Sequence, residues 1–161
     1  MKISTAISSS FGVIFTFVVL LAYADSFEQY AVSVYSGPSA KPDFQSLPSS
    51  RMFRTMIRDG IKEGVNFAGH YAIVTFGCGT DCSSSFLVDV KSGKIFDFPL
   101  GGEENYGLSL DYRRDSKLIK ASWIEGDDPV GNPICVRKEL VLKGATFKPL
   151  HQTKSKEKCD R

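Results

Sequence analysis

The chain has 161 residues, in which 20 lysines and arginines against 18 aspartates and glutamates give a formal net charge of +2. This near balance gives no reason to expect a nucleic-acid partner, because nucleic-acid-binding domains carry a strongly basic face. The length fits one domain of ordinary size with room for a hydrophobic core.

The first 24 residues have the pattern of a secretory signal. Lys2 supplies the positive charge, residues 11–21 are uncharged and apolar, and Ala22-Tyr23-Ala24 fits the small-x-small cleavage pattern. We expect cleavage between Ala24 and Asp25, export to the periplasm or medium, and a mature single domain over 25–161 with a charge of +1. The apolar stretch is short of the ~20 residues that span a bilayer, so we expect no stable membrane insertion after cleavage.

The residues after the signal predict a strand, a broken stretch and a short helix. Alternating side chains over 29–35 predict the strand, and glycine and prolines over 37–48 interrupt regular structure. Ser49 or Ser50 suits the N-cap of a helix that runs to about Asp59, with Gly60 as its stop signal. Its buried face is expected to consist of Met52, Phe53, Met56 and Ile57.

Strands dominate from residue 70 onward. Residues 70–76 are apolar on both faces, which predicts a central strand that is covered on both sides. Further strands are predicted over 86–90, 95–98, 108–112, 118–124 and 134–142, with a short one centred on Phe147. We therefore expect an α+β fold, an antiparallel β-sheet meander of about six to seven strands with one short N-terminal helix packed on it.

All four cysteines lie in the expected mature domain. An even number of cysteines in an exported chain favours disulfides, and four cysteines permit three connectivities. Proximity in sequence favours Cys78–Cys82 and Cys135–Cys159. The second bridge would tether a basic tail over about 150–161, and together the two bridges would stabilise the domain.

The glycine-rich loop over 77–82 invites two functional hypotheses. Its glycines could aim successive N–H groups, including those of Gly79 and Thr80, at a small anionic ligand. Alternatively, the loop and its neighbours could form a hydrolase site. In that site Ser83 or Ser84 would be the nucleophile, His70 the base, and Asp81 or Asp89 the residue that orients the imidazole.

A structural role explains the same residues with fewer assumptions. The sequence shows no strand–nucleophile–helix elbow, and a short disulfide would lock a tight turn between two strands. His70 would then hydrogen-bond a neighbouring backbone group where the chain enters the sheet. A zinc site of Cys78, Cys82 and His70 lacks a fourth ligand at standard spacing, so we expect no metal and no cofactor.

The best surface candidate for a partner lies on the predicted helix. Arg51, Arg54 and Arg58 share one helical face, which Lys62 would extend. Arginine pairs bidentately with carboxylate and phosphate, so this face could contact an acidic partner, although a solvated helix face is the commoner explanation. Two acidic groups, 103–105 and 125–128, lack the ligand spacing of a calcium loop.

One block of sequence resembles an uncharacterised family of small exported bacterial proteins. The block comprises Gly64-Val65-Asn66-Phe67-Ala68-Gly69-His70-Tyr71, then Gly77-Cys78-Gly79-Thr80-x-Cys82, then Asp89-x-Lys91-x-Gly93-Lys94. The likeness covers roughly residues 51–98, and Val65 stands where the family is expected to carry proline. The resemblance implies a periplasmic setting and brings no activity or catalytic residue with it.

The sequence thus favours an exported, non-catalytic binding module. It would be an inhibitor-type or immunity-type module or an envelope interaction protein, because no catalytic set is complete. The alternative is a small hydrolase centred on His70 and the Cys78–Cys82 loop. A thiol sensor, in which Cys78 and Cys82 are free or readily reduced, is a third hypothesis.

Overall fold

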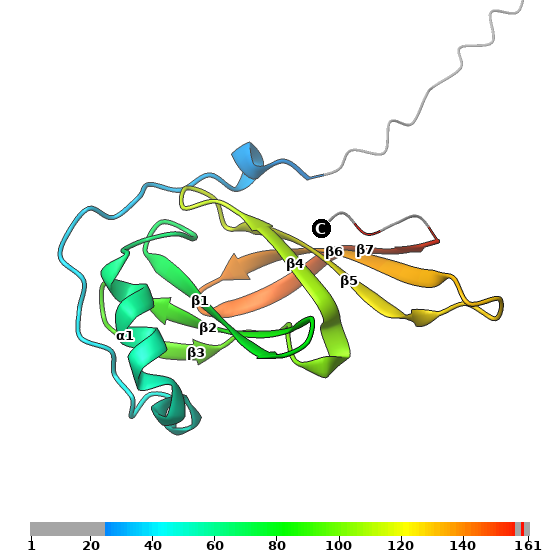
Figure 1. The fold of residues 1–161 in the computed structure, drawn as a ribbon. Coiled ribbons are helices and arrows are strands. Elements are labelled where there is room, and N and C mark those ends of the chain that lie inside the picture. The colour runs from blue at the N-terminus through cyan, green and yellow to red at the C-terminus, as the bar shows by residue number, and fades with distance from the viewer. Residues whose placement is uncertain (1–24, 157–158, 160–161) are drawn as a thin grey trace, which may run out of the picture.

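The computed structural model describes residues 25–156 and 159, so the predicted signal segment lies outside the described residues. Over these described residues the fold contains one α-helix, α1 (Arg54–Lys62), with seven strands and three short 3-10 helices (Figure 1). The 3-10 helices are η1 (Phe27–Tyr30), η2 (Pro48–Phe53) and η3 (Glu103–Asn105). The strands are β1 (Tyr71–Gly79), β2 (Cys82–Asp89), β3 (Ile95–Asp97), β4 (Tyr106–Tyr112), β5 (Leu118–Asp127), β6 (Pro133–Lys143) and β7 (Thr146–Ser155).

The strands form two antiparallel sheets. A small sheet has the order β1-β2-β3 and a large sheet has the order β4-β5-β6-β7. After β3 the chain turns through Gly101 and Gly102, whose φ values of 135° and 71° favour glycine. The Gly102 N–H donates to the carbonyl of Ser83 at 2.8 Å, so the connection crosses the start of β2. The α+β class fits this architecture, whereas the predicted single meander was wrong.

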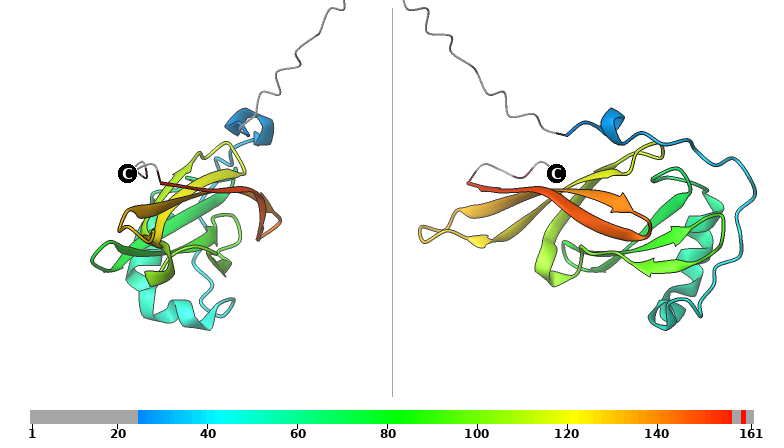
Figure 2. Two further views of the ribbon diagram at one scale, coloured as in Figure 1. Left: turned by 90° about the vertical axis from the view of Figure 1, so that its right-hand side faces the viewer. Right: turned by 180° about the vertical axis from the view of Figure 1, so that it is seen from behind.

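The small sheet lies between α1 and the large sheet (Figures 1 and 2). On β1, Ala72 and Val74 belong to a buried cluster with Ile57 of α1. Tyr71 and Ile73 alternate with them and belong to a second cluster, which is shared with the large sheet. The prediction that this strand is covered on both faces is confirmed, and its two-faced apolar pattern follows from the position between two layers.

The expected central position of this strand was wrong, because β1 is an edge strand of the small sheet. The side chain of Asn66 covers part of that edge. Its Oδ1 accepts a hydrogen bond from the Ile73 N–H at 2.8 Å, and its Nδ2 donates to the Ile73 carbonyl at 3.0 Å. The amide therefore satisfies both backbone groups of Ile73 as a neighbouring strand would.

The helical segment differs from its prediction at both ends. It begins as the 3-10 helix η2, continues as α1, and passes through the predicted stop at Gly60 to end at Lys62. Gly60 serves close packing, because a Cβ there would lie 2.7 Å from Cγ2 of Val74. Met52 and Met56, which were expected in the core, are 88% and 49% exposed.

The last strand is longer than expected. β7 pairs with β6 from Thr146 to Ser155, so most of the predicted tail belongs to the sheet. Its polar sequence suits an edge strand, and Pro149 lies where the register shifts between Glu139 and Leu140, a position that tolerates the missing N–H.

The N-terminal segment crosses one end of the large sheet (Figure 2). The strand predicted over 29–35 was wrong, because η1 occupies residues 27–30 and only Ala31 forms a bridge, to Ser116. The Ser116 hydroxyl donates to the Phe27 carbonyl at 2.7 Å, and the Lys117 N–H donates to the Tyr30 carbonyl at 3.0 Å. Backbone contacts therefore hold this segment to the second half of the chain.

Candidate functional site

The three predicted binding arginines gather around Phe44, which is partly buried. The guanidinium carbons of Arg54 and Arg58 lie 5.5 and 5.7 Å from the centroid of the Phe44 ring. Arg51 reaches the same residue through Nε, which donates to the Phe44 carbonyl at 3.4 Å. Cation–π contacts of this kind fix the guanidinium groups while leaving their outer N–H groups to solvent.

Among the described residues, no carboxylate forms an ion pair with Arg51, Arg54 or Arg58. Lys62 differs, because its ammonium lies 2.8 Å from Oδ1 of Asp59 and is neutralised within the helix. The basic face therefore consists of the three arginines alone. Three exposed positive charges without an internal counterion are available to an anionic partner.

Exposed methionines border this basic face. Met52 directly follows Arg51 in η2. It also lies three residues after Ser49, which lines the cleft described next, and residues three apart share one side of a 3-10 helix. Met56 follows on α1. Methionine and arginine are both enriched in protein interfaces, and methionine side chains adapt to irregular surfaces. The composition of the η2–α1 surface therefore resembles that of a protein interface.

A cleft of about 580 Å³ adjoins this surface, between η2, the β1–β2 hairpin and the connection after β3. Its lining includes an aromatic cluster, in which the rings of Phe53 and Phe76 stack with centroids 4.3 Å apart and the Phe86 ring centroid lies 5.5 Å from that of Phe76. Polar groups of the lining include Ser49, Ser84, Asp97, Glu104 and Asn105. An apolar floor with a few polar groups is typical of a ligand pocket.

Gly79 and Thr80, the predicted anion-binding residues, lie at the end of the β1–β2 hairpin, where Gly79 pairs with Cys82. The carboxylate of the neighbouring Asp81 accepts a hydrogen bond from the Tyr106 hydroxyl at 2.9 Å, and the Asp81 carbonyl accepts one from the Gly107 N–H. The hairpin end thus contacts β4, and Gly77 and Cys78 behind it line the cleft.

The predicted hydrolase residues fall at opposite ends of the same hairpin. His70 Nδ1 lies 2.9 Å from Asp89 Oδ1, whereas Ser83 and Ser84 pair with Gly77 and Phe76. Six strand residues separate the two ends by roughly 20 Å. Ser83 and Ser84 also line different cavities, a hollow of about 330 Å³ and the 580 Å³ cleft respectively. The structure brings His70 and Asp89 together and leaves the serines and Asp81 apart from them.

The partner of His70 is a side chain, so the expected bond to neighbouring backbone was wrong. Asp89 also accepts hydrogen bonds from the Lys91 N–H at 2.9 Å and from the Ser92 hydroxyl at 2.8 Å. Burial alone would raise the pKa of Asp89, but the hydrogen bonds with His70, Ser92 and Lys91 together outweigh it and lower the pKa. The carboxylate thus joins the entry of β1 to the turn after β2.

Both predicted disulfides are present, Cys78–Cys82 and Cys135–Cys159. The bridge between Cys78 and Cys82 occupies both sulfurs, and His70 lies at the other end of the hairpin. These three residues therefore do not form the zinc site that their order in the sequence suggested.

In the acidic loop over 125–128, Asp128 accepts hydrogen bonds from the backbone of Val130 and Asn132 and pairs with Lys156. Its carboxylate thus already has partners within the protein.

Sequence reasoning missed Phe44 and the cleft. Phe44 follows a proline-rich stretch and shows no periodic pattern that would link it to the helix. The cleft depends on the connection after β3, which brings Phe98, Pro99 and Leu100 against η2 and β2. Only the two adjacent glycines at 101–102 signalled a sharp change of direction there.

No model of a known protein family, no curated protein and no solved structure matches this chain. In the part of the chain that the structure describes, no helix has the length and apolar character needed to cross a membrane.

Proposed function

We propose that the protein is an exported, non-catalytic binding module whose η2–α1 surface receives an acidic segment of a partner protein in the cell envelope. The observation that carries the proposal is the clustering of Arg51, Arg54 and Arg58 on Phe44 without a carboxylate partner among the described residues. Inhibitor-type and immunity-type modules bind their targets through surfaces of this kind, by charge complementarity.

The exposed apolar groups beside the arginines favour a protein partner over a free inorganic anion. A small anion would need only the guanidinium groups. It would leave Met52 in water at 88% exposure, and the aromatic cleft unfilled. A protein segment with an apolar side chain next to its acidic groups would contact the arginines, Met52 and the cleft together. The carboxylates of Asp97 and Glu104 in the cleft would repel its acidic groups and so direct them to the arginines.

The hydrolase alternative gains no support from the geometry. His70 and Asp89 have the spacing of a base and its orienting acid, yet both predicted nucleophiles lie at the far end of the hairpin. The disulfide Cys78–Cys82 likewise gives the thiol-sensor hypothesis no free thiol.

The test is photo-cross-linking in the envelope with a diazirine analogue of methionine at position 52. The matched pair consists of Arg51→Ala/Arg54→Ala/Arg58→Ala and Lys117→Ala/Lys143→Ala/Lys148→Ala, which remove the same charge from exposed sites on different surfaces. We expect a cross-link to an acidic peptide of one protein that disappears in the arginine variant, persists in the lysine variant and weakens with salt.

If the two triple variants lose the cross-link to the same extent, net charge alone would explain the loss and the proposal would be overturned. A cross-link that persists in the arginine variant would remove the basic face from the interaction. Circular dichroism spectra and melting temperatures of all three proteins control for folding.

A further inference from the structure

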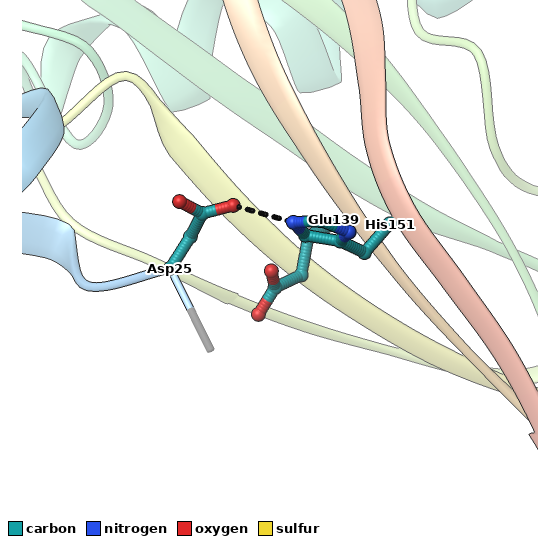
Figure 3. Close-up of side chains that lie close together, drawn as sticks. All are labelled: Asp25, Glu139 and His151. Atoms are coloured by element: carbon teal, nitrogen blue, oxygen red, sulfur yellow. Dashed lines mark ion pairs between the residues drawn. The ribbon is translucent and has the colours of Figure 1, made fainter. Parts of the chain in front are cut away.

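Three side chains of the types that ligate metals come from distant parts of the chain and meet on the outer face of the large sheet (Figure 3). They are Asp25, Glu139 and His151, and one ligand atom of each lies within 4.8 Å of the other two. Figure 3 shows the Asp25 carboxylate directed at the His151 ring, with Glu139 beside them. We propose that these side chains form a binding site for a Zn²⁺ ion.

The strand register creates the site. Lys120, Glu139 and His151 form a row across β5, β6 and β7, because Lys120 pairs with Glu139 and Glu139 pairs with His151. Ile119 and Ala121 alternate with Lys120 and are buried in the core, so Lys120 lies on the opposite face. The N-terminal segment that crosses this face adds the carboxylate of Asp25.

The distances suit a small divalent ion. Zinc binds nitrogen and oxygen at about 2.0–2.2 Å in tetrahedral geometry, which places two ligand atoms about 3.4 Å apart. Asp25 Oδ2 and His151 Nε2 are already 3.2 Å apart. The third ligand atom, from Glu139, completes a triangle whose longest side is at most 4.8 Å, so small side-chain rotations are enough to close it around the ion.

In each of the two carboxylates, Asp25 and Glu139, one oxygen contacts a neighbouring side chain and the other oxygen could bind the ion. The Tyr30 hydroxyl donates to Asp25 Oδ1 at 3.1 Å, which leaves Oδ2 toward His151. Lys120 contacts Glu139 through Oε1 at 3.2 Å, which leaves Oε2. Hydrogen-bond partners behind the ligands are the usual way in which proteins orient carboxylates for a metal. Tyr30 and Lys120 would thus support the ligands without leaving their present contacts.

The ion would also have access and room for water. The side chain of His151 is 63% exposed, whereas those of Asp25 and Glu139 are 19% and 16% exposed. Glu139 and Lys120 also line a hollow of about 280 Å³ on this face. Three protein ligands with an open fourth position correspond to the zinc sites that keep a bound water.

The experiment is calorimetric titration of Zn²⁺ into untagged protein, purified after export and treated with a chelator. We expect one Zn²⁺ per chain, and we expect His151→Asn, Asp25→Asn and Glu139→Gln each to weaken binding about tenfold or more. His70→Asn is the matched control, because His70 is the other histidine of the chain and lies on the small sheet's side. It should leave Zn²⁺ binding unchanged.

The absence of saturable binding to the wild type would overturn the proposal, as would an equal loss in His70→Asn and His151→Asn. A second measurement is the melting temperature, which Zn²⁺ should raise for the wild type and not for His151→Asn. The site lies across the large sheet from α1, so this test is independent of the arginine face and of the partner proposed for it.

Discussion

His70 Nδ1 lies 2.9 Å from Asp89 Oδ1 at the end of the hairpin where β1 begins and β2 ends. Asp89 also accepts hydrogen bonds from the Ser92 hydroxyl and the Lys91 N–H, so one partly buried carboxylate ties three segments together. The contact between His70 and Asp89 therefore has a structural role that does not depend on a substrate.

We expect Asp89→Ala to lower the free energy of unfolding by about 1–3 kcal/mol, because it leaves several donors without their charged acceptor. Ser92→Ala removes only one of these donors and should cost about 0.5–1.5 kcal/mol. Urea unfolding of both variants measures the difference. A larger cost for Ser92→Ala than for Asp89→Ala would contradict this account.

Asp128 should make stability depend on pH in the acid range. Its hydrogen bond with Lys156, followed by those with the backbone of Asn132 and Val130, lowers its pKa from 3.8 to about 2. The unfolded state thus binds this proton more tightly, and the carboxylate's contribution is full above about pH 4 and is lost as the pH falls towards 2. We expect the melting temperature of Asp128→Asn to lie below that of the wild type at neutral pH, with the gap closing over that range.

Asp127→Asn is the matched control for this measurement, because Asp127 is the exposed neighbour of the buried Asp128. If the two variants show the same pH dependence, the effect comes from net charge and the assignment to Asp128 fails.

Gly60→Ala should destabilise the protein although alanine favours helices. In an exposed helix the substitution would gain about 1 kcal/mol. Here the new Cβ would lie 2.7 Å from Val74 Cγ2, so α1 or β1 must shift, and we expect a net loss of about 1–3 kcal/mol. Thr55→Ala, on the exposed side of the same helix, should be neutral or slightly stabilising in the same denaturant titration.

The two disulfides should contribute unequally. They join cysteines separated by 24 residues for Cys135–Cys159 and by 4 residues for Cys78–Cys82. Chain entropy predicts losses of about 3.5 and about 2 kcal/mol when each pair is replaced by alanine. Guanidinium titrations of the two double variants provide the comparison, and a greater loss on removal of the short bridge would show that chain entropy does not govern the difference.

The alternation of apolar side chains along the sequence was enough to predict that β1 is buried on both faces. Ala72 and Val74 alternate with Tyr71 and Ile73, and each pair must be buried against a different neighbour. This pattern therefore predicts that one layer covers each face of the strand. Sequence proximity was likewise sufficient for the disulfide pairs. Local sequence does not specify which strands pair beyond a hairpin, so the division into two sheets after β3 could not be predicted.

The site shows the same limit. The spacing of Arg51, Arg54 and Arg58 placed them on one face, but nothing in the sequence linked them to Phe44. The hydrolase hypothesis treated neighbours in sequence as neighbours in space. Only β1 and a turn lie between His70 and Ser83 in the sequence, yet the length of the hairpin separates them in space. Asp25, Glu139 and His151 have no spacing pattern, because cross-strand register and a returning terminal segment bring them together.

The docking of the N-terminal segment also sets the order in which the native structure can close. Residues 27–31 bond to Ser116 and Lys117, and Asp25 pairs with His151, so the first described residues find these partners in the second half of the chain. These contacts have high sequence separation, and loops of that length close slowly. The N-terminal segment therefore cannot complete its native contacts until β5 and β7 have been synthesised and are in place.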